Sequence, residues 1–142
     1  CCRCSHLAEH RYSKQTAGPA IMIGRGVEAV DIERFRDVLS RTPSLKTRVF
    51  TSAELELADT RKDATAALAA RFAVREATMK ALGVGLGAFD FHDVSVRKAA
   101  SGAPELIVSG RAQELADQLG ITQWRVSLSH THIVAVAVVA AS

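Results

Sequence analysis

Residues 71–83 read Arg71-Phe72-Ala73-Val74-Arg75-Glu76-Ala77-Thr78-Met79-Lys80-Ala81-Leu82-Gly83. This stretch ends an alanine-rich helix that we expect to run from about Ala64 to Leu82 and to stop at Gly83. Glu76 and Lys80 lie one turn apart, which places them on the same face. They form either an ordinary ion pair or a metal ligand beside a cation that binds phosphate.

Arg75 falls within the apolar stripe of the same helix, which is an unusual place for a cation. Its guanidinium must reach solvent along the helix surface or meet an anion inside the protein. Three charged side chains beside a face of small alanines favour a polar cleft over a plain solvated surface. The helix therefore carries the first candidate residues for chemistry.

Length and composition limit what the chain can be. Its 142 residues fit one domain, 48% of them are apolar, and the formal net charge is +3. So small a basic excess does not argue for nucleic acid, but it suits a phosphorylated ligand or an acidic protein partner. No apolar run is long enough to span a membrane. The three cysteines all lie within the first four residues, which indicates a reducing, cytoplasmic setting.

Residues 1–21 differ from the rest because they lack hydrophobic periodicity. A zinc site is one interpretation of this segment, because it contains Cys2, Cys4, His6 and His10. Their spacing, however, is tighter than that of a usual structural zinc site. We therefore expect a flexible N-terminal extension over residues 1–21 and a single folded domain over residues 22–142.

The domain reads as α+β, with a long helix and an antiparallel sheet. A capping box of Thr51 with Glu54 predicts a short helix from about Ser52, and Asp31 is suited to cap a helix over Ile32 to Ser40. The last third predicts strands joined by short turns. The expected elements are a strand from Ile21 to Val27, a strand from Phe89 to Lys98 with a bulge near His92, its partner over Glu105 to Val108, a helix over 110–119 capped by Ser109, and strands around Trp124 to Leu128 and Ile133 to Val139.

Glu28 and Glu76 are candidate ligands for a hard divalent cation such as magnesium, which prefers carboxylate oxygens completed by water and phosphate. They can act together only if the first strand lies beside the long helix. Otherwise Glu28 is a solvated loop carboxylate. His130 lies in the connection between the last two strands, where a histidine is either incidental or part of a site.

Four segments in order resemble one family. Residues 26–35, 50–54, 71–83 and 127–130 resemble the holo-acyl-carrier-protein synthases, which are small 4′-phosphopantetheinyl transferases. The resemblance implies their α+β fold, a homotrimer with active sites between subunits, and a role in fatty acid and lipid biosynthesis. It also implies the reaction, in which phosphopantetheine moves from coenzyme A to a serine of apo acyl carrier protein with the help of magnesium.

The resemblance also implies roles for individual residues. Glu28 and Glu76 correspond to the metal site, and Glu76, Lys80 and His130 to the catalytic residues. Arg34 and Arg41 correspond to positions that dock the acidic carrier protein. The positions expected to bind coenzyme A are Arg71, Arg75, Lys80, Gly83, His130 and Thr131.

Three positions depart from the usual pattern of that family. Glu28 stands where aspartate is usual, Arg75 where lysine is usual, and Thr131 where many relatives carry an acidic residue. The longer Glu28 side chain moves its carboxylate by roughly one C–C bond. The alternative to an active transferase is therefore a catalytically impaired paralogue that still binds coenzyme A or the carrier protein.

Overall fold

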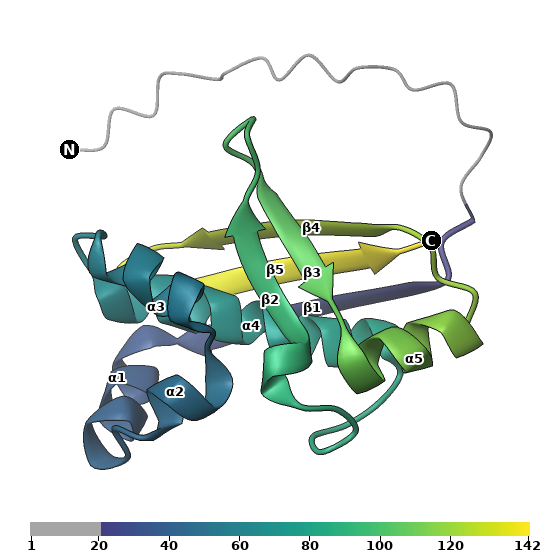
Figure 1. The fold of residues 1–142 in the computed structure, drawn as a ribbon. Helices are drawn as coiled ribbons and strands as arrows, with labels where there is room; N and C mark the ends of the chain where they lie inside the picture. The colour runs from purple at the N-terminus through teal and green to yellow at the C-terminus, as the bar shows by residue number, and fades with distance from the viewer. Residues whose placement is uncertain (1–20) are drawn as a thin grey trace.

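The computed structural model describes residues 21–142 (Figure 1). The expected extension and the zinc ligands considered above fall outside these residues, apart from Ile21. The elements, in chain order, are β1 (Gly24–Asp31), α1 (Ile32–Arg41), α2 (Leu45–Val49), α3 (Ser52–Asp59), α4 (Ala64–Leu82), the 3-10 turn η1 (Phe91–Asp93), β2 (Val94–Lys98), β3 (Pro104–Val108), α5 (Gly110–Gln118), β4 (Trp124–His130) and β5 (Val134–Ala141).

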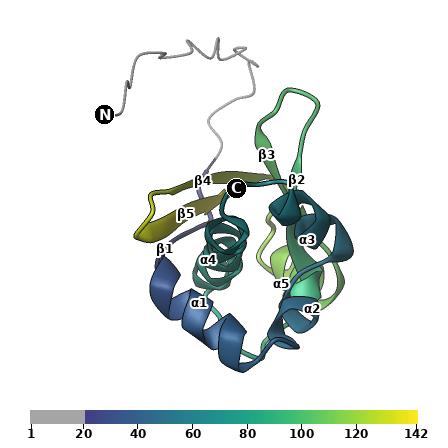
Figure 2. The same cartoon turned by 90° about the vertical axis from the view of Figure 1, so that its left-hand side faces the viewer.

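Helix α4 is the centre of the domain and has the predicted bounds. Asp63 caps its first turn by accepting a hydrogen bond from the Ala66 amide, and Gly83 ends it in the left-handed conformation with a φ of 71°. Figure 2 shows α4 almost end-on, with the sheet on one side and α1, α3 and the β2–β3 hairpin around the rest. No helix within residues 21–142 has the length and apolarity needed to cross a membrane.

Strands β1, β5 and β4 form an antiparallel sheet in that order, so β1 and β4 are its two edges. β1 starts later than predicted and continues through Asp31, which places Glu28 in the strand and not in a loop. The strand lies very close to α4, because a Cβ at Gly24 or Gly26 would collide with the carbonyl oxygens of Ala81 or Ala77. The two glycines therefore let the strand and the helix meet backbone to backbone.

The outer face of this sheet carries exposed valines on β1 and β5 that no other part of residues 21–142 covers. Val27 is 56% exposed and Val138 is 46% exposed, although they are directly paired across β1 and β5. Figure 2 shows no described helix on this side of the sheet. Exposed apolar side chains that lie together on a sheet can form part of a surface that packs against another protein.

The segment before β2 differs from the prediction. Instead of one strand from Phe89 with a bulge, residues 91–93 form the turn η1, and β2 begins at Val94. The cause is local, since Asp90 accepts a hydrogen bond from the His92 amide while the Asp93 carboxylate accepts one from the Asp90 amide. Asp93 also accepts a hydrogen bond from the Arg111 amide. It thereby satisfies the start of α5, where the Ser109 side chain makes no capping bond.

Candidate functional site

Two glutamates from different elements lie side by side at the β1 edge of the sheet. Glu28 on β1 is paired with Ala137 of β5, and Glu76 lies on the face of α4 that the strand approaches. The close contact of Gly26 with Ala77 brings the two carboxylates within interaction range. The structure thus joins the two acids that the sequence suggested as a pair.

Lys80 binds Glu28 and not Glu76. Its Nζ lies 2.8 Å from Oε2 of Glu28 and donates a second hydrogen bond of 3.0 Å to the carbonyl oxygen of Val27. The simple i,i+4 ion pair with Glu76 is therefore not the main contact of this lysine. One ammonium and two carboxylates form a compact charged group, which we call the acidic cluster (Glu28, Glu76 and Lys80).

The two carboxylates of the acidic cluster are not equivalent. The hydrogen bond from Lys80 is the main cause that lowers the pKa of Glu28 below its usual 4.5. Burial is the main cause that raises the pKa of Glu76, and the neighbouring Glu28 carboxylate raises it further. Two like charges in contact favour one ionised and one protonated member. Glu28 is the ionised member and Glu76 is the one that holds a proton more readily.

The donor set of the acidic cluster fits a hard divalent cation. Its oxygens come from two neighbouring carboxylates, which are accompanied by one ammonium. Within residues 21–142 there is no group of three or more His, Cys, Asp or Glu side chains placed to hold a metal. Magnesium commonly takes only one or two protein carboxylates and fills its other positions with water and phosphate oxygens.

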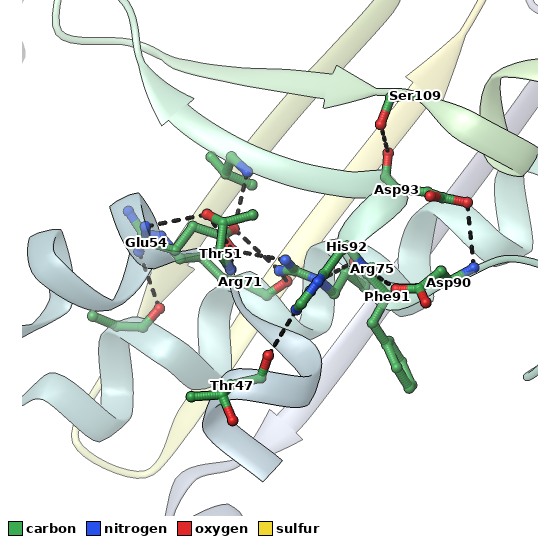
Figure 3. Close-up of polar contacts among 12 residues, drawn as sticks. Thr47, Thr51, Glu54, Arg71, Arg75, Asp90, Phe91, His92, Asp93 and Ser109 are labelled. Carbon is green, nitrogen blue, oxygen red and sulfur yellow. Dashed lines mark hydrogen bonds and ion pairs between the residues drawn. The ribbon is translucent and has the colours of Figure 1, made fainter. Parts of the chain in front are cut away.

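Arg75 points away from this cluster and is fully buried. Figure 3 shows its guanidinium against Glu54, with bonds of 3.1 Å from Nη1 to Oε1 and 2.7 Å from Nη2 to Oε2. Its Nε donates to the carbonyl oxygen of Phe91 at 2.9 Å, and the group lies over the Phe50 ring. The anion that the sequence required is therefore internal. The expectation that Arg75 contacts coenzyme A is at odds with this arrangement, because its side chain has no exposed surface.

Glu54 is the residue that the sequence reading missed. Its capping box with Thr51 was predicted and is present, but the same carboxylate also accepts a 3.0 Å hydrogen bond from the Val96 amide. It therefore ties α3, α4 and β2 together. The available signal was the cation in the apolar stripe of α4, which required an acid from elsewhere in the chain.

A basic cleft of about 340 Å³ opens on the other side of α4, between α3, the β2–β3 hairpin and β4. Arg71 is the informative residue in its wall, since it is only 8% exposed and its Nε has no hydrogen-bond partner. Its Nη1 donates to the carbonyl oxygen of Ala67. Burial lowers the pKa of Arg71. The other charged or titratable residues of the wall are Arg61, Arg97, Lys98 and His130.

An unpaired buried donor in a wall of cations is suited to an anionic ligand such as a phosphate. The sequence reading named Arg71 and His130 for this role but missed Arg61, Arg97 and Lys98. The adjacent Arg97 and Lys98 are visible in the sequence. Only the folded hairpin places them opposite α4.

The remaining predicted site residues are divided between the two regions. His130 is the last residue of β4 and not part of a loop, and its side chain lines the basic cleft. Thr131 does not line that cleft, because its hydroxyl accepts hydrogen bonds from the Ile133 and Val134 amides and shapes the turn. Gly83 ends α4 and does not line the basic cleft.

The acidic cluster and the basic cleft are separate in one chain. Arg71 and Glu76 are five residues apart on α4, which turns their side chains about 140° away from each other. Glu28 lies on one edge strand of the sheet and His130 on the other. No residue of the acidic cluster lines the basic cleft.

Arg34 and Arg41 are both exposed on α1. They differ from Arg36 of the same helix, which is bound to Asp63 at 3.0 Å and to Glu33 at 3.2 Å. Arg34 and Arg41 are therefore accessible to solvent, while Arg36 holds α1 against the start of α4.

Comparison with known proteins gives a consistent result. Residues 26–137 match the family model of the 4′-phosphopantetheinyl transferase superfamily. The chain is 46% identical over 121 residues to the holo-acyl-carrier-protein synthase of Streptomyces griseus, which covers 85% of this chain and 98% of the relative. It is 43% identical over 117 residues to that of Moorella thermoacetica, covering 82% and 91%.

A solved structure agrees with these sequences. The Helicobacter pylori holo-acyl-carrier-protein synthase in complex with coenzyme A superposes with a TM-score of 0.72 and 30% identity, covering 83% of this chain and 99% of that one.

Proposed function

The chain belongs to the 4′-phosphopantetheinyl transferase superfamily, and from this premise we propose that it transfers phosphopantetheine from coenzyme A to a serine of an apo acyl carrier protein. The observation that carries the proposal is the buried, unpaired Nε of Arg71 in a cleft lined by cations. Coenzyme A carries three phosphates, and a cleft of this charge suits its adenosine 3′-phosphate end. The complex of the Helicobacter pylori relative with coenzyme A supports the same ligand.

The chemistry requires groups that the acidic cluster supplies. The serine oxygen forms a bond to the phosphorus that carries the pantetheine, and the bridging P–O bond of the diphosphate breaks. Adenosine 3′,5′-bisphosphate leaves with the electron pair. We assign Glu76 as the group that accepts the serine proton. Lys80 offers a positive charge to the leaving phosphate.

We assign Glu28 and Glu76 as the protein ligands of a magnesium ion. When bound, this ion would neutralise charge on the diphosphate. The placement of the two carboxylates within interaction range of each other supports the assignment. Glu28 also orients Lys80 through their 2.8 Å ion pair.

We propose that the complete site forms between two copies of the chain. One copy offers the acidic cluster at its β1 edge, and the next offers the basic cleft at its β4 edge. Contacts of this head-to-tail kind close into a ring when the rotation between copies allows it, and the resemblance implies a ring of three. The exposure of Val27 and Val138 supports the assembly, since packing between copies at this face would bury both side chains.

The acyl carrier partner is expected to dock on α1. Arg34 and Arg41 are exposed, and an acidic partner would be steered toward them at low salt.

The variant Arg34→Glu should lower kcat/KM for the carrier protein by about tenfold through slower association, and added salt should shrink the difference. Arg36→Gln is a poor control because Arg36 holds α1 in place. Lys62→Gln is suitable because its side chain is exposed.

The direct test is mass spectrometry of a purified apo carrier protein incubated with this chain and coenzyme A, with magnesium and with a chelator. We expect the carrier to gain one phosphopantetheine with magnesium, and far less with the chelator. No mass change with any divalent ion would contradict the transferase. If coenzyme A still bound to the chain, the impaired binding module would be the better description.

A further inference from the structure

The ammonium of Lys80 lies beside the carboxylates that we assign to the magnesium ion. It is 2.8 Å from Oε2 of Glu28, 3.0 Å from the carbonyl oxygen of Val27, and it acts electrostatically on Glu76 as well. A divalent ion bound by Glu28 and Glu76 would therefore meet a positive charge already in place. A divalent ion bound through Oε2 of Glu28 would compete with the ammonium for that oxygen, because both cations are attracted to it.

We propose that Lys80 is a built-in exchangeable cation. It is held on Glu28 while no divalent ion is bound, and it is released toward the diphosphate when the ion takes its place. The inference rests on the proposed function, because the metal ion and the diphosphate both come from it. It adds a conformational step, in which occupation of the metal site makes Lys80 available to the substrate.

The exposure of the side chains indicates which partner moves. Lys80 is 54% exposed, whereas the Glu28 side chain is only 20% exposed and its Oε1 also accepts a hydrogen bond from the Ala29 amide. Lys80 occupies the last turn of α4, just before Gly83. The lysine therefore has the freedom to swing outward, while Glu28 is held at the strand.

The length of the Glu28 side chain is essential to this contact. Aspartate would withdraw the carboxylate by roughly one C–C bond, which would stretch the present 2.8 Å contact with Lys80 beyond ion-pair range unless the lysine followed. The Val27 carbonyl favours the observed position of Nζ and opposes such a shift. The restraint on Lys80 is thus a property of this chain, in which glutamate stands at position 28.

Release of Lys80 couples two ligands. A divalent ion that frees the lysine raises the affinity for coenzyme A, and coenzyme A raises the affinity for the ion by the same factor. Without the ion, Glu28 competes with coenzyme A for the lysine. Weakening the Glu28–Lys80 contact should therefore strengthen coenzyme A binding even when no metal is present.

The test is isothermal titration calorimetry of coenzyme A into the chain in the presence of a chelator. The variant Glu28→Asp keeps the charge but loosens the contact, so we expect its coenzyme A affinity to rise about two- to fivefold, the strength typical of a half-exposed ion pair. In the Lys80→Gln background the same Glu28→Asp change should have no effect. A gain that persists without Lys80, or no gain at all, would overturn the proposal.

A second titration uses magnesium alone. We expect Lys80→Gln to bind magnesium about fivefold more tightly than the unaltered chain, because the competing ammonium is gone. Lys80→Arg keeps the cation and should show no gain. Lys46→Gln removes an exposed lysine on α2 and controls for net charge. Equal magnesium affinity in all four proteins would contradict the exchange but leave the transferase intact, whereas a failure of every protein to bind magnesium would contradict both.

Discussion

Arg75 and Glu76 are neighbours in the chain, yet the structure treats them in opposite ways. Arg75 is fully buried, and all its nitrogens find oxygens within the protein. Glu76 is half-buried beside a second carboxylate, and its pKa is raised by burial and then by that neighbouring carboxylate. A charge whose partners are all internal holds the fold together. A charge left partly unsatisfied at the surface is available for a ligand.

We expect the largest effect on stability from replacing Arg75, the buried member of these two neighbours. Arg75→Met removes the cation and leaves the Glu54 carboxylate buried, at a cost of about 3–5 kcal/mol in the free energy of unfolding. Urea denaturation measures this loss. Arg34→Met, on the exposed face of α1, should change stability by less than about 0.5 kcal/mol.

Arg75→Lys sharpens the same point, since lysine keeps the charge but not the two-pronged contact with Glu54. It should lose less stability than Arg75→Met. A stability of Arg75→Met equal to that of the unaltered chain would show that the buried pair does not hold the fold.

Glu76→Gln should have the opposite profile, with a large effect on activity and little on stability. We expect the transfer rate to fall about 100-fold, as for the loss of one well-placed charged group in an active site. The change removes the repulsion between two carboxylates, so stability should stay the same or rise. Rates come from the mass-spectrometric assay and stability from urea denaturation. A stable Glu76→Gln variant with full activity would remove Glu76 from the site.

The smallest effect is a difference in the pH dependence of stability. Glu76 binds its proton more tightly in the folded state than in the unfolded chain, where its pKa is the usual 4.5. Its contribution to the free energy of unfolding is therefore present below pH 4.5 and is lost as the pH rises through its raised pKa. Glu28 behaves inversely, because its pKa is lowered and its contribution is lost only as pH falls below 4.5.

Relative to the unaltered chain, Glu76→Gln should therefore gain stability as pH rises above 4.5, by about 1 kcal/mol or less for a half-exposed group. Urea denaturation at several pH values from 4 to 7 measures the difference. If the free energies of unfolding of the two proteins differed by the same amount at every pH in this range, the result would contradict the shifted pKa of Glu76.

The contrast between Arg75 and Glu76 also shows which features of the structure can be predicted from local sequence signals. The bounds of α4, the Asp31 cap and the Thr51–Glu54 box were correct, because each depends on residues within one or two turns. Glu54 as the partner of Arg75 was missed, since the two are 21 residues apart and meet only when α3 packs on α4.

The start of β2 was wrong because a reciprocal pair of aspartates, Asp90 and Asp93, outweighs the strand propensity of the segment. The basic cleft was only partly predicted. Arg71 and His130 were named through the resemblance, whereas Arg61, Arg97 and Lys98 join them only through tertiary packing. Local pattern thus predicted the elements, and long-range packing decided which charges serve structure and which line a site.

The division of charges between two faces of α4 leads to the central claim, that one working site takes its acidic cluster from one copy and its basic cleft from another. Mixing subunits of Glu76→Gln with subunits of Arg71→Gln, each inactive alone, tests this claim most directly. Random exchange in a ring should give about a quarter of the sites both intact halves. We therefore expect the mixture to recover about a quarter of the unaltered transfer activity. A mixture as inactive as its two components would show that each chain holds its site alone, and would contradict the account.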